Sequence, residues 1–267
     1  MLYYRLFIAF ILLSVSAAGH ARDSLRMATT TSTDNSGLLK VLHPPFEAQH
    51  DIRVDVIAVG TGKALRLGEQ GDVDIVFVHA PDAEQAFVEA GFGVKRYPVM
   101  HNDFVIVGPE GDPAGIGVLT SASQALKQLA ESQAVFISRG DDSGTHKKEK
   151  SLWNEAGIEP GGDWYLAVGQ GMGAVLKIAD DKGAYALTDR GTYLAYQDKI
   201  QLKVVVEGAP ALFNPYHVIM VNPEKHPHVN RQAAEAYIDY IRSEAGQLII
   251  RNFKVAGKQL FHPDVIP

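Results

Sequence analysis

Short apolar runs alternate with amphipathic stretches along almost the whole chain. The apolar runs predict strands at 25–29, 52–59, 74–79, 103–107, 134–138, 164–168, 184–188, 202–206 and 217–221. The stretches between them have helical spacing and predict helices at 37–49, 62–70, 82–91, 121–132, 143–156, 171–182, 190–198 and 229–253. Pro44 and Pro45 fall inside the first helix, and we expect them to distort or end it. Strands alternating with helices predict an α/β fold with mostly parallel pairing.

Two segments have the pattern of strands that cross between lobes. HNDFVIVGP (101–109) and NPYHVIMVNP (214–223) both follow a polar bend, run extended and end at a proline. We therefore expect one lobe from 22–107 with 206–267 and a second lobe from 108–205. Two crossovers of this kind would form a hinge around a central cleft, where a ligand is trapped on closure. A single continuous α/β domain is the alternative.

The composition limits the classes of function. Of 267 residues, 46% are hydrophobic and 21% charged, as in ordinary globular proteins. The chain has no cysteine, which excludes disulfides, thiolate metal sites, iron–sulfur clusters and lipid attachment to cysteine. The formal net charge of −6 argues against nucleic acid or an anionic membrane surface as a partner.

Residues 1–21 have the pattern of a signal peptide. Arg5 gives a basic start, an apolar run follows, and small residues precede a preferred cleavage site after Ala21. The run is too short to span a bilayer of about 30 Å comfortably, so we expect no stable membrane insertion after cleavage. An uncleaved anchor is the alternative. We expect a periplasmic protein, because a second membrane would retain a freely diffusing one.

Two strand ends of the first lobe carry candidate donors for an anion. In TTTSTDNSGLL (29–39), hydroxyl residues follow a strand and precede a helix, where free amides attract negative charge. Helix capping without any ligand explains such a cluster equally well. In VGTGKAL (59–65), Thr61 is a donor, and Gly62 allows a ligand to approach the backbone. This is not a phosphate-binding Walker loop, because Ala64 stands where Ser or Thr is required.

The segment SRGDDSGTH (138–146) gives the sharpest signal for an oxyanion. Arg139 follows a strand and offers a permanently charged fork. Ser143 and Thr145 add hydroxyls at the start of the next helix, and Gly144 adds an unobstructed amide. Asp141 is expected to hold Arg139 in position or to cap the helix. The similar segment ALTDRGTYLA (186–195) favours a structural ion pair at a helix start over a ligand contact.

Enzyme signatures are missing from the sequence. The nucleophile motif G-x-S-x-G is absent, and the ten histidines form no metal-binding pair at helical spacing. We therefore expect no catalytic residues, no resident metal and no cofactor. A periplasmic phosphoester hydrolase is a less favoured alternative, and a sensor domain of the same fold is a third.

These motifs, in this order, together with FNPYHVIMVNP (213–223), resemble the tungstate-binding components of ABC-type importers. The resemblance covers nearly the whole chain after residue 21. It implies the two-lobed fold of type II periplasmic binding proteins, with a membrane permease and an ATPase as partners. The anion contacts that it implies fall on Thr30, Thr31, Ser32, Thr61, Gly62, Arg139, Ser143 and Thr145.

The resemblance leaves the choice of oxyanion open. The pattern Arg-x-Asp-x-Ser-Gly-Thr is also similar to that of phosphate-binding proteins, so phosphate is the alternative ligand. Tungstate and molybdate are fully deprotonated at neutral pH and accept hydrogen bonds only. Hydrogen phosphate would benefit from a buried carboxylate acceptor, for which Asp34 and Asp141 are candidates. Tungstate and molybdate share charge and nearly share size, so the motifs do not separate them.

Overall fold

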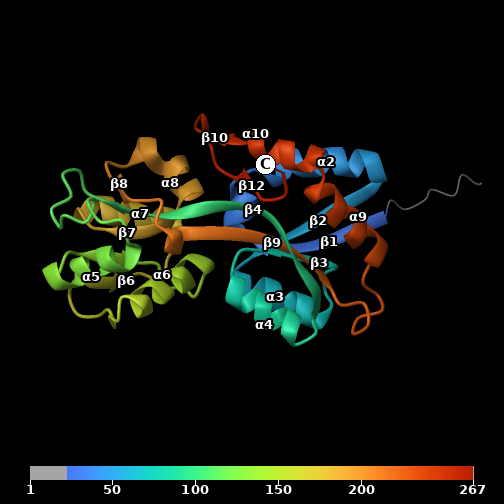
Figure 1. Ribbon diagram of the computed structural model, residues 1–267, viewed down its shortest axis with the longest axis horizontal. Helices are drawn as coiled ribbons and strands as arrows, with labels where there is room; N and C mark the ends of the chain where they lie inside the picture. The colour runs from blue at the N-terminus through green and yellow to red at the C-terminus, as the bar shows by residue number, and fades with distance from the viewer. Residues whose placement is uncertain (1–22, 267) are drawn as a thin grey trace, which may run out of the picture.

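The computed structural model describes residues 23–266, which form two lobes joined by two long strands (Figure 1). The expected signal peptide, 1–21, lies outside these residues. Among the described residues, no helix combines the length and apolar character needed to cross a membrane.

The first lobe is built on a sheet with the strand order β12-β4-β9-β3-β1-β2. Three parallel neighbours form one end of it: β1 (Asp23–Thr30) lies between β2 (Ile52–Val59) and β3 (Ile75–Val78). Helices cover both faces, with α2, α9 and α10 on one and α3 and α4 on the other (Figure 1). Their bounds are α1 (Thr31–Asn35), α2 (Leu39–His50), α3 (Thr61–Gln70), α4 (Pro81–Glu89), α9 (Arg231–Arg242) and α10 (Glu244–Asn252).

The second lobe surrounds the far end of β4 (Gly93–Gly108). There β7 (Ala186–Asp189) and β8 (Lys203–Val206) pair antiparallel with β4, while β5 (Phe136–Ser138) pairs parallel with β6 (Tyr165–Ala167). The helices of this lobe are α5 (Ala122–Ser132), α6 (Gly144–Glu155), α7 (Met172–Lys182) and α8 (Arg190–Tyr196). The remaining short elements of the described chain, in both lobes, are η1 (Gln197–Lys199), η2 (Pro210–Leu212), β10 (Lys254–Val255), β11 (Lys258–Gln259) and β12 (His262–Pro263).

The two lobes are connected by the predicted crossing strands. β4 pairs antiparallel with β9 (Phe213–Val221) as far as the partners Asp103 and Phe213, and then continues into the second lobe. One register pair of this ladder is Asn102 with Asn214. The prediction of two strand crossovers is therefore confirmed, whereas the residue boundaries given above for the lobes stay a prediction.

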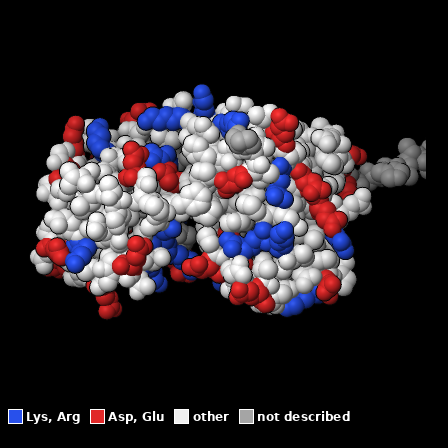
Figure 2. Space-filling model, viewed as in Figure 1, with Lys and Arg blue, Asp and Glu red and all other residues white. Residues whose placement is uncertain are grey.

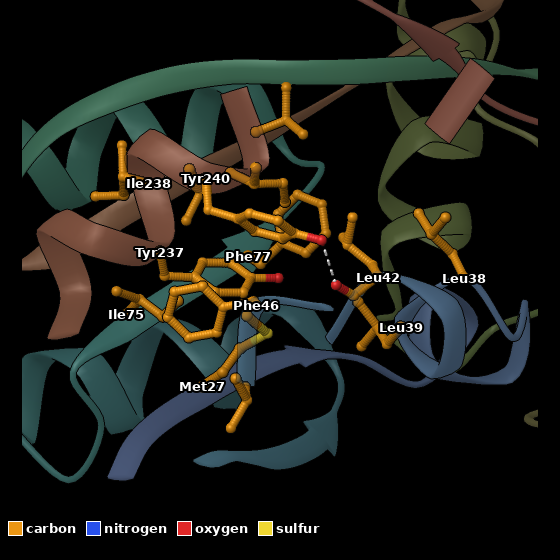
Figure 3. Close-up of a cluster of buried hydrophobic side chains, with 14 of the residues drawn as sticks. Met27, Leu38, Leu39, Leu42, Phe46, Ile75, Phe77, Tyr237, Ile238 and Tyr240 are labelled. Carbon is orange, nitrogen blue, oxygen red and sulfur yellow. Dashed lines mark hydrogen bonds between the residues drawn. The ribbon is translucent and has the colours of Figure 1, made fainter. Parts of the chain in front are cut away.

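Buried side chains form a separate core in each part of the molecule. Alternation along β1 sends Met27 to the face under α2 and α9 and Ala28 to the opposite face. Figure 3 shows the first cluster, in which the Tyr240 hydroxyl donates to the Leu42 carbonyl at 2.8 Å. In the second lobe, Phe104 belongs to a cluster with Trp153 and others, all almost fully buried.

Three sequence predictions about the elements are wrong or incomplete. The pairing is not mostly parallel, because β4 and β9 make long antiparallel ladders with each other and with their neighbours. The predicted helix 229–253 is divided at Ser243, which caps α10 through its hydroxyl. Pro44 and Pro45 do not end α2, which runs on to His50. Burial of Leu39, Leu42 and Phe46 on this helix, worth roughly 1.5–3 kcal/mol each, offsets the cost of the hydrogen bonds that the prolines cannot donate.

Candidate functional site

A cavity of about 630 Å³ lies between the lobes. Thr31 and Ser32 line it from the first lobe, and Arg139 lines it from the second. The crossing strands contribute Asn102 and Tyr216 to the same wall. The cavity thus brings the first and third predicted motifs together, although a long stretch of chain separates them.

The hydroxyl motif of the first lobe is tied together by its own hydrogen bonds. Thr30 is the N-cap of α1, and its Oγ1 accepts from the Thr33 amide at 3.2 Å. The same oxygen lies 2.6 Å from Thr33 Oγ1 and 3.1 Å from Ser32 Oγ. Thr30 is 4% exposed, whereas Thr31 is exposed and Ser32 half-buried. The motif therefore presents Thr31 and Ser32 to the cavity and keeps Thr30 behind them.

His79, which the sequence analysis did not single out, sits at the centre of this cluster. It directly follows β3, and its Nε2 lies 3.1 Å from Thr30 Oγ1 and 3.4 Å from Ser32 Oγ. Its Nδ1 lies 3.0 Å from Asn214 Oδ1, and its ring stacks on Tyr216 with centroids 4.5 Å apart. Its position at the carboxyl end of a strand was the available signal, because ligands of open α/β sheets bind there.

Burial controls the charge of this histidine. Desolvation lowers the pKa of His79 from its ordinary value, and the hydrogen bond with Asn214 opposes the shift without cancelling it. The nearby charges of Asp189 and Glu84 also oppose it. The ring is therefore neutral at pH 7 in the empty site.

The second motif supplies a buried hydroxyl with no partner. Thr61 is the first residue of α3 and is 1% exposed, and its Oγ1 has no hydrogen-bond partner among the described residues. A Cβ placed on Gly144 would lie 3.4 Å from Thr61 Oγ1 and 3.4 Å from His79 Cε1. The start of α6 in the second lobe therefore faces the start of α3 in the first. Gly62 follows on α3, beside the guanidinium of Arg66.

The third motif holds its arginine with a carboxylate. Arg139 Nε donates to Asp141 Oδ2 at 2.8 Å, and the Ser143 amide donates to Asp141 Oδ1 at 3.1 Å. Partial burial alone would raise the pKa of Asp141, but the Ser143 bonds and the Arg139 charge leave it lowered. Asp141 therefore holds Arg139 as expected and accepts from the turn before α6, but it does not cap this helix, whose N-cap is Ser143. Arg139 keeps the other side of its guanidinium for the cavity that it lines.

Hydrogen bonds at the N-cap of α6 and at buried Glu149 hold the first half of this helix in place. Ser143 is its N-cap and accepts from the His146 amide at 3.3 Å, and Thr145 is buried. Further along, buried Glu149 accepts hydrogen bonds from Ser138 at 3.0 Å and Tyr165 at 2.7 Å. Burial raises the pKa of Glu149, and these donors oppose the shift. The helix that carries Gly144 is thereby fixed to β5 and β6.

The fourth motif has the structural arrangement that the sequence favoured. Asp189 caps α8 by accepting from the Thr192 amide at 2.8 Å and the Thr192 hydroxyl at 2.7 Å. Arg190 forms ion pairs of 2.6 Å with Asp103 and with Glu207. These charges are satisfied within the protein, although Asp189 and Thr192 also line the main cavity.

The cavity carries donors but no group of metal ligands. Within residues 23–266, no three histidine, aspartate or glutamate side chains converge to hold a metal ion. Figure 2 shows a notch between the lobes that both basic and acidic side chains border. This arrangement can surround a small anion with hydroxyls, helix-start amides and one guanidinium.

Comparison with known proteins gives the family. A family model described as a PBP superfamily domain matches residues 14–245. This chain belongs to the PBP superfamily. The match confirms the two-lobed fold that the motifs implied.

Within the superfamily, the chain belongs with the TupA proteins. The tungstate-binding protein TupA of Peptoclostridium acidaminophilum is 47% identical over 248 residues, covering 91% of this chain and 87% of the relative. The structure of the tungstate-binding protein TupA from Desulfovibrio alaskensis is 49% identical, with a TM-score of 0.83, and the match covers 91% and 99% of the two chains. A structure titled as the tungstate ABC transporter from Geobacter sulfurreducens is 56% identical, with a TM-score of 0.77 and coverage of 86% and 98%. The family inferred from the sequence motifs is therefore confirmed.

Proposed function

We propose that this chain is a solute-binding protein that captures tungstate between its lobes and delivers it to an ABC importer. Molybdate, of the same charge and shape, is the second ligand of the proposal. The observation that carries it is the buried Thr61 hydroxyl, which has no partner among the described residues and lies where the starts of α3 and α6 face each other. An unsatisfied buried hydroxyl costs roughly 1–3 kcal/mol, so a ligand that accepts its hydrogen bond recovers that cost.

The proposed contacts are those that the motifs predicted. They are Thr30, Thr31, Ser32, Thr61, Gly62, Arg139, Ser143, Gly144 and Thr145. Each charge-assisted bond to a dianion contributes roughly 1.5–3 kcal/mol net, so a handful supports submicromolar capture. Because Thr30 lies behind Ser32 and is bonded to His79, its contribution is indirect.

The state of the carboxylates favours a fully ionised oxyanion over hydrogen phosphate. Asp141 already accepts from Arg139 and Ser143 with its two oxygens, and Asp189 accepts from Thr192 with both of its own. Each of these four oxygens already accepts one hydrogen bond, so neither carboxylate offers hydrogen phosphate an oxygen without a donor. An anion that only accepts hydrogen bonds suits this set of donors.

The cellular setting completes the proposal. The chain is exported by cleavage of residues 1–21 and acts in the periplasm, where a membrane permease with its ATPase receives the ligand. It has no resident metal or cofactor and catalyses no reaction itself; tungsten enters only as the oxyanion. Neither nucleic acid nor the membrane is a partner.

The test is a thermal melt of ligand-stripped protein with tungstate, molybdate, phosphate and sulfate in turn. A ligand at about 100 times its dissociation constant stabilises the folded protein by roughly 2.7 kcal/mol, which is a clear shift in Tm. Tungstate and molybdate are expected to stabilise most. If phosphate stabilised the protein most, the proposed ligand would be wrong. If none of the four anions stabilised it, the proposed class of solute-binding protein would be wrong.

A further inference from the structure

A chain of hydrogen bonds leads from the crossing strands into the cavity. Asn214 Nδ2 donates to Asn102 Oδ1 at 2.6 Å, and Asn214 Oδ1 faces His79 Nδ1 at 3.0 Å. The other ring nitrogen reaches Thr30 Oγ1, which in turn reaches Ser32 Oγ. Asn102, His79, Asn214 and Thr30 are all buried, and Ser32 lines the cavity.

The two asparagines fix which nitrogen of His79 carries hydrogen. Because Asn214 donates to Asn102 with its amide nitrogen, its oxygen points at the ring and accepts. Nδ1 must therefore carry a hydrogen, and in a neutral ring Nε2 is then bare and accepts. The hydrogen of Thr30 is directed to Nε2, and Thr30 then accepts from the Thr33 hydroxyl at 2.6 Å and from Ser32. In this state both hydroxyl hydrogens point away from the cavity.

Adding one proton to Nε2 exchanges donor and acceptor in the hydrogen bonds that run from His79 through Thr30 to Ser32. The protonated ring donates to Thr30 Oγ1, Thr30 donates to Ser32 Oγ, and Ser32 turns its hydrogen into the cavity. We propose that His79 is a positioning residue whose protonation turns the hydroxyls of Thr30 and Ser32 toward the bound oxyanion. The proton comes from solvent, and no covalent bond to the anion forms or breaks. This inference rests on the proposed function, because it concerns the same site.

The surroundings of His79 give the direction of the pH dependence. Asp189 and Glu84 are the acidic groups that act on the ring, and Glu84 is itself paired with Arg96 at 3.0 Å and His217 at 2.9 Å.

Further charged groups face the ring from the other elements. Asp82 of α4 and Lys147 and Lys148 of α6 line a second cavity with His79, and Arg139 lines the main cavity with Ser32. A dianion beside Ser32 raises the pKa of His79 above its lowered empty-site value.

Thermodynamic linkage then gives the sign of the change of affinity with pH. Since the bound state holds the proton more tightly than the empty state, affinity rises as pH falls, by up to about tenfold per pH unit between the two pKa values. Binding in that window takes up a proton, up to roughly one per anion. If Nε2 already carried a hydrogen in the neutral ring, anion binding would take up no proton.

The experiment is calorimetric titration of tungstate between about pH 6.5 and 8.5, in buffers of different ionisation enthalpy. The wild-type protein is expected to take up a proton and to bind more tightly at the acid end. His79→Gln keeps a neutral amide near Nε2 and is expected to show flat affinity and no uptake. His43→Gln is the matched control, because His43 is also buried but bonds Tyr237 instead, and it should behave as wild type.

Thr30→Val separates the hydroxyl chain from simple attraction between charges. It interrupts the chain and leaves His79 in place, so both the affinity and its pH dependence should fall. In Thr30→Val, a pH dependence as steep as that of the wild type would overturn the inference, as would a flat profile in the wild type. Wild-type protein that binds no tungstate at any pH would overturn the proposed function instead.

Discussion

The two walls of the cleft are built from opposite chemistry. In the first lobe, Thr30, Ser32, Thr61 and His79 are neutral, mostly buried and largely bonded to one another. In the second lobe, Arg139 carries a permanent charge and is held by Asp141 at the protein surface. We expect the neutral wall to direct hydrogen bonds and the charged wall to supply most of the attraction. A dianion would then be held without an unpaired charge in the core.

Removing the charge should have the largest effect. Arg139→Ala is expected to weaken tungstate binding roughly 100-fold or more, because two charge-assisted bonds of roughly 1.5 kcal/mol each are lost. Arg139→Lys keeps the charge without the fork and should recover part of this loss. Calorimetric titration measures both, with Arg53→Ala as a control on the exposed pair with Asp55. Affinity within threefold of wild type in Arg139→Ala would remove this residue from the site.

The neutral wall should respond to loss of a single hydroxyl. Thr61→Val is expected to weaken binding about tenfold, and the empty protein should melt higher because a buried unsatisfied hydroxyl is removed. Thr29→Val is the matched control, since Thr29 Oγ1 donates to the Phe77 carbonyl at 2.7 Å. That variant should lose about 1 kcal/mol of stability with unchanged affinity. If Thr61→Val lowers the melting temperature of the empty protein, its hydroxyl has a partner and our account of this wall is wrong.

The contact between the walls should be sensitive to a methyl group. Gly144→Ala places a Cβ between Thr61 Oγ1 and His79 Cε1, at 3.4 Å from each. A residue at this first helical position tolerates alanine, so stability should be kept while affinity falls about fivefold, or roughly 1 kcal/mol. Thermal melting and titration of the same preparation distinguish the two quantities. Unchanged affinity would mean that the walls need not meet there when the anion is bound.

The smallest effect is expected at Lys63. It is exposed on the first turn of α3, next to Gly62, and its charge is screened by solvent. Lys63→Ala should change affinity by less than about twofold in 0.15 M salt. A larger loss would show that the first lobe also supplies charge, which would erase the contrast between the walls.

Local sequence patterns predicted much of the fold, and the wrong predictions concern pairing between strands that lie far apart in the chain. Short apolar runs located β1, β2 and β3, and all four residues of β3 are buried. The first half of β4 was missed because Pro98 and two register irregularities break its alternation. Its antiparallel pairing depends on β9, which lies far along the chain, so no local pattern could reveal it.

The site was partly predictable for the same reason. Arg139 and Thr61 stand out because hydroxyls, glycine and a cation at strand-to-helix turns have a known use. His79 does not, because a lone histidine after an apolar strand is usually a core residue. Its partner Asn214, and Asn102 to which Asn214 donates, gain meaning only when β4 and β9 place them opposite each other. Such a network appears only once the strands are paired.

The last stretch of the described chain returns to the hinge region and closes one side of the main cavity. Leu260 and Phe261 line that cavity, and β12 adds His262 and Pro263 to the edge of β4. Trimming the protein after α10 would strip an apolar wall from the pocket and leave a sheet edge uncovered, which invites aggregation.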